Sequence, residues 1–211
     1  MNSWKEATGW LYKSVLISAL AGIIGAVAAV FSVFNTVSNA AGAAAKGHGG
    51  DALQAVSDGA NTLDTITLIT GIVSIACTVI FLVYITKLID LVNAADKDAV
   101  SKIRLANVIA IVGSIFVAFV PSLGIVAFII NVVAWVILFM AYGSLKNSST
   151  FPAEAAKGMG RLRTAMILSI IGALIALIPF IGFIGGLVSL FAFIWNILGW
   201  KRVANSDAPA C

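Results

Sequence analysis

The sequence predicts an all-α fold: a polytopic transmembrane helical bundle with about six spans, paired as three helical hairpins. Hydrophobic residues make up 61% of the 211-residue chain and charged residues only 10%, whereas about 25% of the residues in a soluble domain are charged. Mean hydropathy is correspondingly high, at +1.06. The few charges lie in short stretches between long apolar segments. These segments are therefore expected to face lipid or one another.

Six apolar segments are expected to form transmembrane helices within a single membrane domain over residues 1–211. They cover residues 15–34, 66–85, 105–120, 125–141, 164–178 and 183–199. The first segment has about 20 residues and would extend roughly 30 Å as a helix, which is the thickness of the hydrocarbon core. It is too long for the apolar region of a cleaved signal peptide. We therefore interpret it as a retained span.

The first two spans are separated by residues 36–63, a segment rich in alanine and glycine. We expect this segment to form an external loop with helical portions. His48 stands there among glycines, and a lone histidine lacks the other ligands that a metal site requires. The sequence therefore predicts neither a metal ion nor a cofactor.

Proline and glycine mark the turns of the second and third hairpins. Pro121 and Gly124 enclose the first of these turns, and Pro179 and Gly182 enclose the second. Proline ends a helix because it lacks an amide N–H, and glycine permits the chain to reverse. Each turn is therefore expected to join two adjacent antiparallel helices.

The second and third hairpins share a pattern that predicts an internal repeat. Arg104 precedes Gly113 by the same number of residues as Arg163 precedes Gly172, and alanine lies two positions after each arginine. A turn with proline and glycine then follows in both copies. The first hairpin shares less of this pattern.

The distribution of basic residues predicts the orientation. Of the 13 lysines and arginines, only Lys46 falls on the side of the 36–63 loop. Basic residues in short loops stay in the cytoplasm, so both termini and the linkers 88–103 and 147–162 are expected to be cytoplasmic, at the plasma (inner) membrane. These linkers are expected to bind anionic lipid. No separate basic domain indicates a nucleic-acid partner.

Ionisable residues are missing from the six apolar segments, which contain no Asp, Glu, Lys, Arg or His. An intramembrane enzyme or proton relay would place such groups inside the spans. The sequence therefore predicts no catalytic residues and a non-enzymatic protein.

Weakly polar side chains form one candidate functional stripe within the spans. It comprises Thr67, Thr70, Ser74, Thr78 and Asn131. The first four recur at three- and four-residue spacing, so they share one helix face. The stripe could line a wetted path or ligand groove. The more common arrangement is that such hydroxyls bond to their own backbone carbonyls or to a neighbouring helix.

Small residues form candidate helix-packing faces. Ser18, Ala21 and Gly25 share a face of the first span, and Gly182 and Gly186 form a GxxxG pattern at the last. In lipid, helices associate through close van der Waals contact at small residues. A homo-oligomer or a complex with another membrane protein is therefore expected.

These features together favour a structural or assembly (scaffold) component of a membrane over two alternatives. One alternative is a channel or small transporter with a weakly polar path, since internal repeats are frequent in carriers. The other is a membrane-shaping hairpin protein, because the apolar segments of the second and third hairpins are short relative to the hydrocarbon core.

Overall fold

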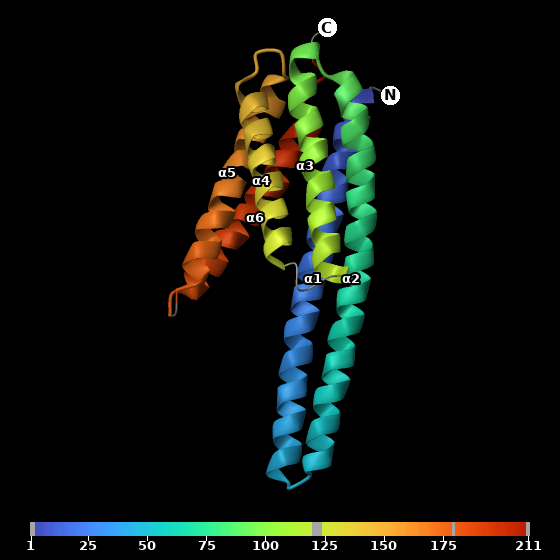
Figure 1. The fold of residues 1–211 in the computed structure, drawn as a ribbon, viewed down its shortest axis with the longest axis vertical. Helices are drawn as coiled ribbons and strands as arrows, with labels where there is room; N and C mark the ends of the chain where they lie inside the picture. The colour runs from blue at the N-terminus through green and yellow to red at the C-terminus, as the bar shows by residue number, and fades with distance from the viewer. Residues whose placement is uncertain (1–2, 120–123, 179, 210–211) are drawn as a thin grey trace. The chain divides into compact units, whose positions relative to one another are not determined.

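The structure is a computed structural model that describes residues 3–119, 124–178 and 180–209, with the side chains of residues 115–119 left out. The described residues form six helices and no strand (Figure 1). The helices are α1 (Ser3–Ala45), α2 (Gly49–Leu91), α3 (Ala94–Phe119), α4 (Gly124–Asn147), α5 (Ala153–Ala176) and α6 (Gly182–Ala204). The predicted all-α class is confirmed.

Most of these helices have the length and apolar character that a membrane span requires. Among the described residues, 5 helices are long and apolar enough to cross a membrane, and α3 is the one that is not among them. The apolar segment predicted for α3, residues 105–120, reaches Val120, which lies outside the described residues. The chain is therefore an integral membrane protein with multiple apolar helices, as its composition predicts.

The prediction of a loop over residues 36–63 is wrong. Helix α1 continues to Ala45 and α2 begins at Gly49, so only residues 46–48 connect them. Gly47 lies in this connection with a φ of 76°, a left-handed conformation that glycine adopts without steric cost. The high helix propensity of the alanines in this segment offsets the low helix propensity of its glycines.

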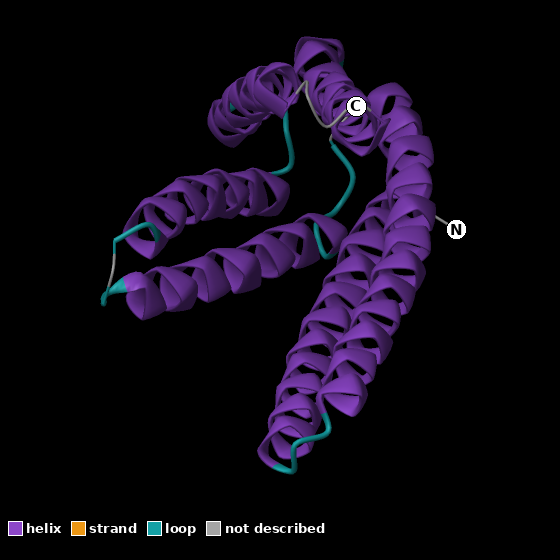
Figure 2. Ribbon diagram, turned by 60° about the horizontal axis from the view of Figure 1, so that its bottom comes forward, coloured by secondary structure: helices purple, strands orange, loops and turns teal. Residues whose placement is uncertain are grey.

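The predicted linkers also prove to be largely helical. Helix α2 ends at Leu91 and α3 begins at Ala94, within the predicted linker 88–103. In the second linker, predicted over 147–162, only residues 148–152 separate α4 from α5. Figure 2 shows how short these connections are. The charged residues that flank the apolar segments therefore largely belong to the helices.

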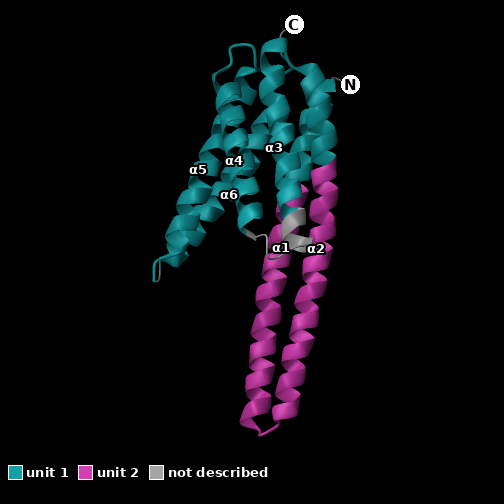
Figure 3. Ribbon diagram, viewed as in Figure 1, with its two compact units in different colours: residues 1–15, 80–211 teal, residues 16–79 magenta. Residues whose placement is uncertain are grey.

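The chain divides into two compact units (Figure 3). Unit 2 comprises residues 16–79, and unit 1 comprises residues 1–15 and 80–211. Helices α1 and α2 contribute to both units. The single membrane domain predicted for residues 1–211 stays a prediction.

Unit 2 is a pair of antiparallel helical segments from α1 and α2 that meet at glycines. A Cβ added to Gly25 on α1 would lie 2.6 Å from Cγ2 of Thr70 on α2. At the second contact the roles are reversed, since Gly59 on α2 lies directly against the side chain of Thr36 on α1. A glycine on each helix thus admits a threonine of the other, which permits close approach of the two backbones.

The core lies in unit 1 and is built around two tryptophans. Trp4 and Trp200 are almost fully buried, together with Leu11, Ile85, Leu88, Val100, Ile103, Leu145, Met159, Leu162 and Val203. Trp200 makes edge-to-face contacts with Phe81, at 5.2 Å between ring centroids, and with Tyr142, at 6.4 Å. Aromatic pairs prefer this geometry over a face-to-face sandwich.

Hydrogen bonds join the N-terminal and C-terminal segments of unit 1 beside this core. The indole Nε1 of Trp4 donates to the backbone oxygen and to Oγ of Ser206, at 3.2 Å each. Nearby, the Thr150 hydroxyl donates to Oδ2 of Asp96 at 2.7 Å, which joins the α4–α5 connection to the first turn of α3. The N-terminal segment, the C-terminal segment and this connection therefore lie at one end of unit 1, which we call the terminal end.

Apolar side chains elsewhere in unit 1 are widely exposed. At the α5–α6 turn, Leu177 and Phe183 are more than three-quarters exposed and Phe180 is fully exposed. Phe180 also has a φ of 68°, an unfavourable backbone conformation for a bulky residue. Exposed apolar surface on this scale is incompatible with a water-facing shell and is suited to lipid.

Candidate functional site

The predicted polar stripe forms hydrogen bonds within its own helices. The hydroxyls of Thr67, Thr70 and Thr78 donate to the carbonyl oxygens four residues earlier, at 2.8–2.9 Å. Asn131 donates from Nδ2 to the carbonyl four residues earlier in α4, at 2.9 Å. Ser74 supplies the carbonyl that accepts from Thr78. These bonds occupy the hydroxyl donors of the three threonines, and a functional role for the stripe stays a prediction.

The predicted packing residues have different surroundings. Ser18 and Ala21 are half-buried on α1, and Gly25 contacts Thr70 as described. At the start of α6, a Cβ on Gly182 would lie 3.1 Å from the Ala176 carbonyl oxygen.

A Cβ built on Gly186 would meet no heavy atom of another described helix within 4 Å. Its neighbour Gly185 instead packs against the backbones of Gly172 and Ala176 on α5. The two helices also meet at Gly158 and Gly199, where a Cβ on Gly158 would lie 2.7 Å from the Gly199 carbonyl oxygen.

The predicted turn residues are only partly described. Gly124 and Gly182 are the first residues of α4 and α6. Pro121 and Pro179 lie outside the described residues.

A set of cations held over aromatic rings is the feature that sequence reasoning did not find. The rings of Trp10 and Tyr84 stack in parallel, with centroids 5.6 Å apart and planes 14° from parallel. Lys13 Nζ lies 4.9 Å from the Trp10 centroid, and Lys87 Nζ lies 4.6 Å from the Tyr84 centroid. We call these four residues the Trp10 cluster.

A similar arrangement occurs between α4 and α5. The Arg163 guanidinium carbon lies 4.3 Å from the centroid of Phe139, and Phe139 stacks on Trp135 at 5.1 Å. Arg161 lies 5.8 Å from the centroid of Trp195 on α6. Each such contact contributes about 0.5–1 kcal/mol when exposed and more when desolvated.

These cations share one electrostatic property. In the described part of the chain, no carboxylate lies within ion-pair distance of Lys13, Lys87, Arg161 or Arg163, since the ion pairs found are made by Lys5, His48, Lys102 and Lys157. Their positive charge is therefore available to an external anion. Spacing along the sequence could have revealed the Trp10–Lys13 and Tyr84–Lys87 pairs, because residues three apart on a helix are neighbours.

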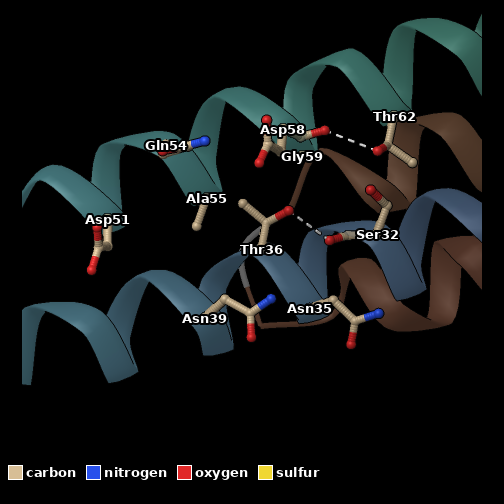
Figure 4. A pocket seen from close by; sticks show the side chains of 10 residues that line it. All are labelled: Ser32, Asn35, Thr36, Asn39, Asp51, Gln54, Ala55, Asp58, Gly59 and Thr62. Atoms are coloured by element: carbon tan, nitrogen blue, oxygen red, sulfur yellow. Dashed lines mark hydrogen bonds between the residues drawn. The ribbon is translucent and has the colours of Figure 1, made fainter.

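Unit 2 contains a polar groove between α1 and α2 (Figure 4). Its volume is about 460 Å³, and its lining consists of Ser32, Asn35, Thr36, Asn39, Asp51, Gln54, Ala55, Asp58, Gly59 and Thr62. The hydroxyls of Thr36 and Thr62 donate to carbonyls of their own helices, as the dashed lines show. Among the residues described, no group of three or more His, Cys, Asp or Glu could hold a metal ion.

No protein-family model, curated protein or solved structure matches this chain. The case for its function therefore depends on the residues described above.

Proposed function

We propose that this chain is a non-enzymatic structural or assembly component of the plasma (inner) membrane that holds anionic lipid at the terminal end of unit 1. The observation that carries the proposal is the Trp10 cluster, in which two lysine ammonium groups lie over a stacked pair of aromatic rings. Tryptophan and tyrosine favour the headgroup region of a bilayer, where an amphipathic ring has both apolar and polar surroundings. Lysines at that depth attract anionic headgroups.

The proposed orientation has both termini in the cytoplasm. The hydrogen bonds between Trp4 and Ser206 support an orientation with the two termini on the same side of a membrane. The excess of basic residues near them favours the cytoplasmic side, where anionic lipids create a negative surface potential.

Three helical hairpins with an internal repeat belong to the same proposal. In the proposed repeat, Gly113 of α3 corresponds to Gly172 of α5. A Cβ on Gly113 would lie 2.9 Å from Nδ2 of Asn131 on α4, and a Cβ on Gly172 would lie 2.5 Å from Oγ of Ser189 on α6. Each glycine thus packs against a polar side chain of the following helix. This shared contact supports a common packing scheme in the two hairpins.

Self-association is the assembly step that we propose. A Cβ on Gly186 would meet no heavy atom of another described helix of its own chain within 4 Å, so this surface of α6 is open to close approach by a second copy.

Neutralising the Trp10 cluster is expected to weaken the preference for anionic lipid. Each lysine near an anionic surface contributes about 1 kcal/mol, so the double variant Lys13→Gln/Lys87→Gln should bind anionic lipid roughly tenfold or more weakly. The measurement is the thermal-unfolding midpoint of the purified protein in nanodiscs of phosphatidylcholine, with and without phosphatidylglycerol. Lys46→Gln is the matched control, because Lys46 lies in the connection between α1 and α2.

The proposal also predicts how anionic lipid affects the stability of the unaltered protein. Phosphatidylglycerol should raise its unfolding midpoint, the double variant should lose much of that increase, and Lys46→Gln should retain it. An unaltered protein that is equally stable in both lipids would contradict lipid binding at the terminal end.

A further inference from the structure

We propose that the interface between α4 and α5 at the terminal end contains a site for the phosphate group of an anionic membrane lipid, held by Arg163 and Lys146. This inference rests on the proposed function and narrows it to one site outside the Trp10 cluster. The interface is defined by Phe139, Gly143 and Lys146 on α4 and by Gly160 and Arg163 on α5, and we call it the α4–α5 seam.

Helical spacing places these residues on facing surfaces. Phe139, Gly143 and Lys146 follow one another at four- and three-residue intervals on α4, which puts them on one side of that helix. Gly160 and Arg163 are three residues apart on α5 and share a side in the same way.

Each cation in the seam lies against a glycine of the other helix. A Cβ added to Gly143 would lie 3.4 Å from both Cζ and Nη1 of Arg163. In reciprocal fashion, a Cβ added to Gly160 would lie 3.4 Å from Cδ of Lys146. The glycines therefore let both long side chains lie in the seam.

Arg163 has donors that the chain does not use. Its Nε is buried and, among the described residues, has no hydrogen-bond partner. The guanidinium carbon lies over the Phe139 ring, 4.3 Å from its centroid. The group carries further N–H donors on its two Nη atoms, which point outward in the plane of the guanidinium.

Because Nε is buried, an external anion would meet the Nη groups of Arg163. A guanidinium fits phosphate particularly well because two parallel N–H groups match two phosphate oxygens.

The charges in the seam also favour an anion. Arg163 and Lys146 lie on one interface, and the structure shows no carboxylate within ion-pair distance of either among the residues it describes. A phosphate at the seam would be attracted by both positive charges.

The surroundings point to a lipid phosphate. On α4, the Trp135 ring stacks on Phe139, and Val136 and Met140 beside them are exposed. On α5, Ile167 is exposed one turn beyond Arg163. An acyl chain can cover these apolar side chains while its phosphate reaches the two cations, whereas a free phosphate ion would leave them uncovered.

The test measures lipid binding to the purified full-length protein by native mass spectrometry and by thermal unfolding in phosphatidylcholine nanodiscs. Phosphatidylglycerol is the lipid probe and inorganic phosphate is the free-anion probe. Arg163→Gln and Lys146→Gln should each weaken phosphatidylglycerol binding about tenfold, since a hydrogen bond to a charged group contributes about 1.5–3 kcal/mol. Arg163→Lys should restore only part of the affinity, because lysine cannot bind phosphate in a bidentate manner.

Lys157→Gln is the matched control. Lys157 is an exposed lysine on α5 whose Nζ already pairs with Glu154 at 2.6 Å. The affinity of this variant for phosphatidylglycerol should equal that of the unaltered protein. Lys146 is exposed, so Lys146→Gln is expected to fold even if Arg163→Gln does not. In that case the affinity of Lys146→Gln for phosphatidylglycerol tests the site.

Two results would overturn the site. If both seam variants bind phosphatidylglycerol as tightly as the unaltered protein while Lys13→Gln/Lys87→Gln binds it weakly, the site is wrong and the proposed function stands. If inorganic phosphate stabilises the unaltered protein as much as phosphatidylglycerol does, the ligand is a free anion and not a lipid. An unaltered protein with no preference for phosphatidylglycerol would instead remove the proposed function itself.

Discussion

Replacing Trp200 by alanine is expected to destabilise the protein by about 3–5 kcal/mol, the usual cost of truncating a buried tryptophan. Trp200 is 2% exposed and contacts the rings of Phe81 and Tyr142 from two other helices. Its removal opens a cavity where α2, α4 and α6 meet. Because domains are typically stable by only about 5–15 kcal/mol, the thermal-unfolding midpoint in detergent should fall steeply.

Trp10→Ala provides the comparison for this experiment. Trp10 is 38% exposed and stacks on a single ring, Tyr84. Its truncation creates no enclosed cavity and should lower the unfolding midpoint far less. Equal losses in the two variants would contradict a core centred on Trp200.

A leucine at Gly185 is expected to force α5 and α6 apart and to destabilise the protein by about 1–3 kcal/mol or more, the cost of overpacking. A Cβ at this position would lie 2.8 Å from Cα of Ala176. That atom belongs to the backbone of α5, so no change of side-chain rotamer can relieve the clash. The measurement is again the unfolding midpoint in detergent.

The neighbouring variant Gly186→Leu separates packing within the chain from packing between copies. A Cβ on Gly186 meets no heavy atom within 4 Å among the described residues, so the folded chain should tolerate leucine there. If copies associate through this surface, the oligomer distribution should shift toward monomer without loss of stability. An unfolding midpoint lowered as much as in Gly185→Leu would contradict the described contact between α5 and α6.

Hydropathy predicts the helices well because it measures the property that lipid selects. Segments such as residues 66–85 and 125–141 are strongly apolar and contain no ionisable residue, and the structure places helices there. Over residues 36–63, polar residues and glycines lower the hydropathy, and the sequence therefore predicts a loop. The segment is helical nevertheless, since α1 and α2 pack against each other there through Gly59 and Thr36.

Local patterns are less informative about the candidate sites. The GxxxG spacing selects Gly182 and Gly186, whereas Gly185 makes the contact with α5 backbone. The rotation of a helix about its axis depends on its neighbours, which the spacing of residues in one helix cannot specify. The stacking of Trp10 on Tyr84 joins residues far apart in the sequence and is equally inaccessible to such patterns.

Some features of the candidate sites are nevertheless readable from the sequence. Basic residues and aromatic rings at the ends of the apolar segments are typical of an interface with anionic lipid. Arg163 and Gly172 are members of the repeated pattern that relates the second and third hairpins. The glycine opposite Arg163, Gly143, belongs to no such pattern, because its role depends on the packing of α4 against α5.

Labelling with a membrane-impermeant maleimide tests the central claim, a bilayer-embedded chain with both termini in the cytoplasm. The native Cys211 reports on the C-terminal side, and a His48→Cys variant reports on the connection between α1 and α2, both in a Cys77→Ala background. In intact cells the reagent should label the thiol at position 48 and should reach Cys211 only after the membrane is permeabilised. Labelling of Cys211 in intact cells would contradict the claim.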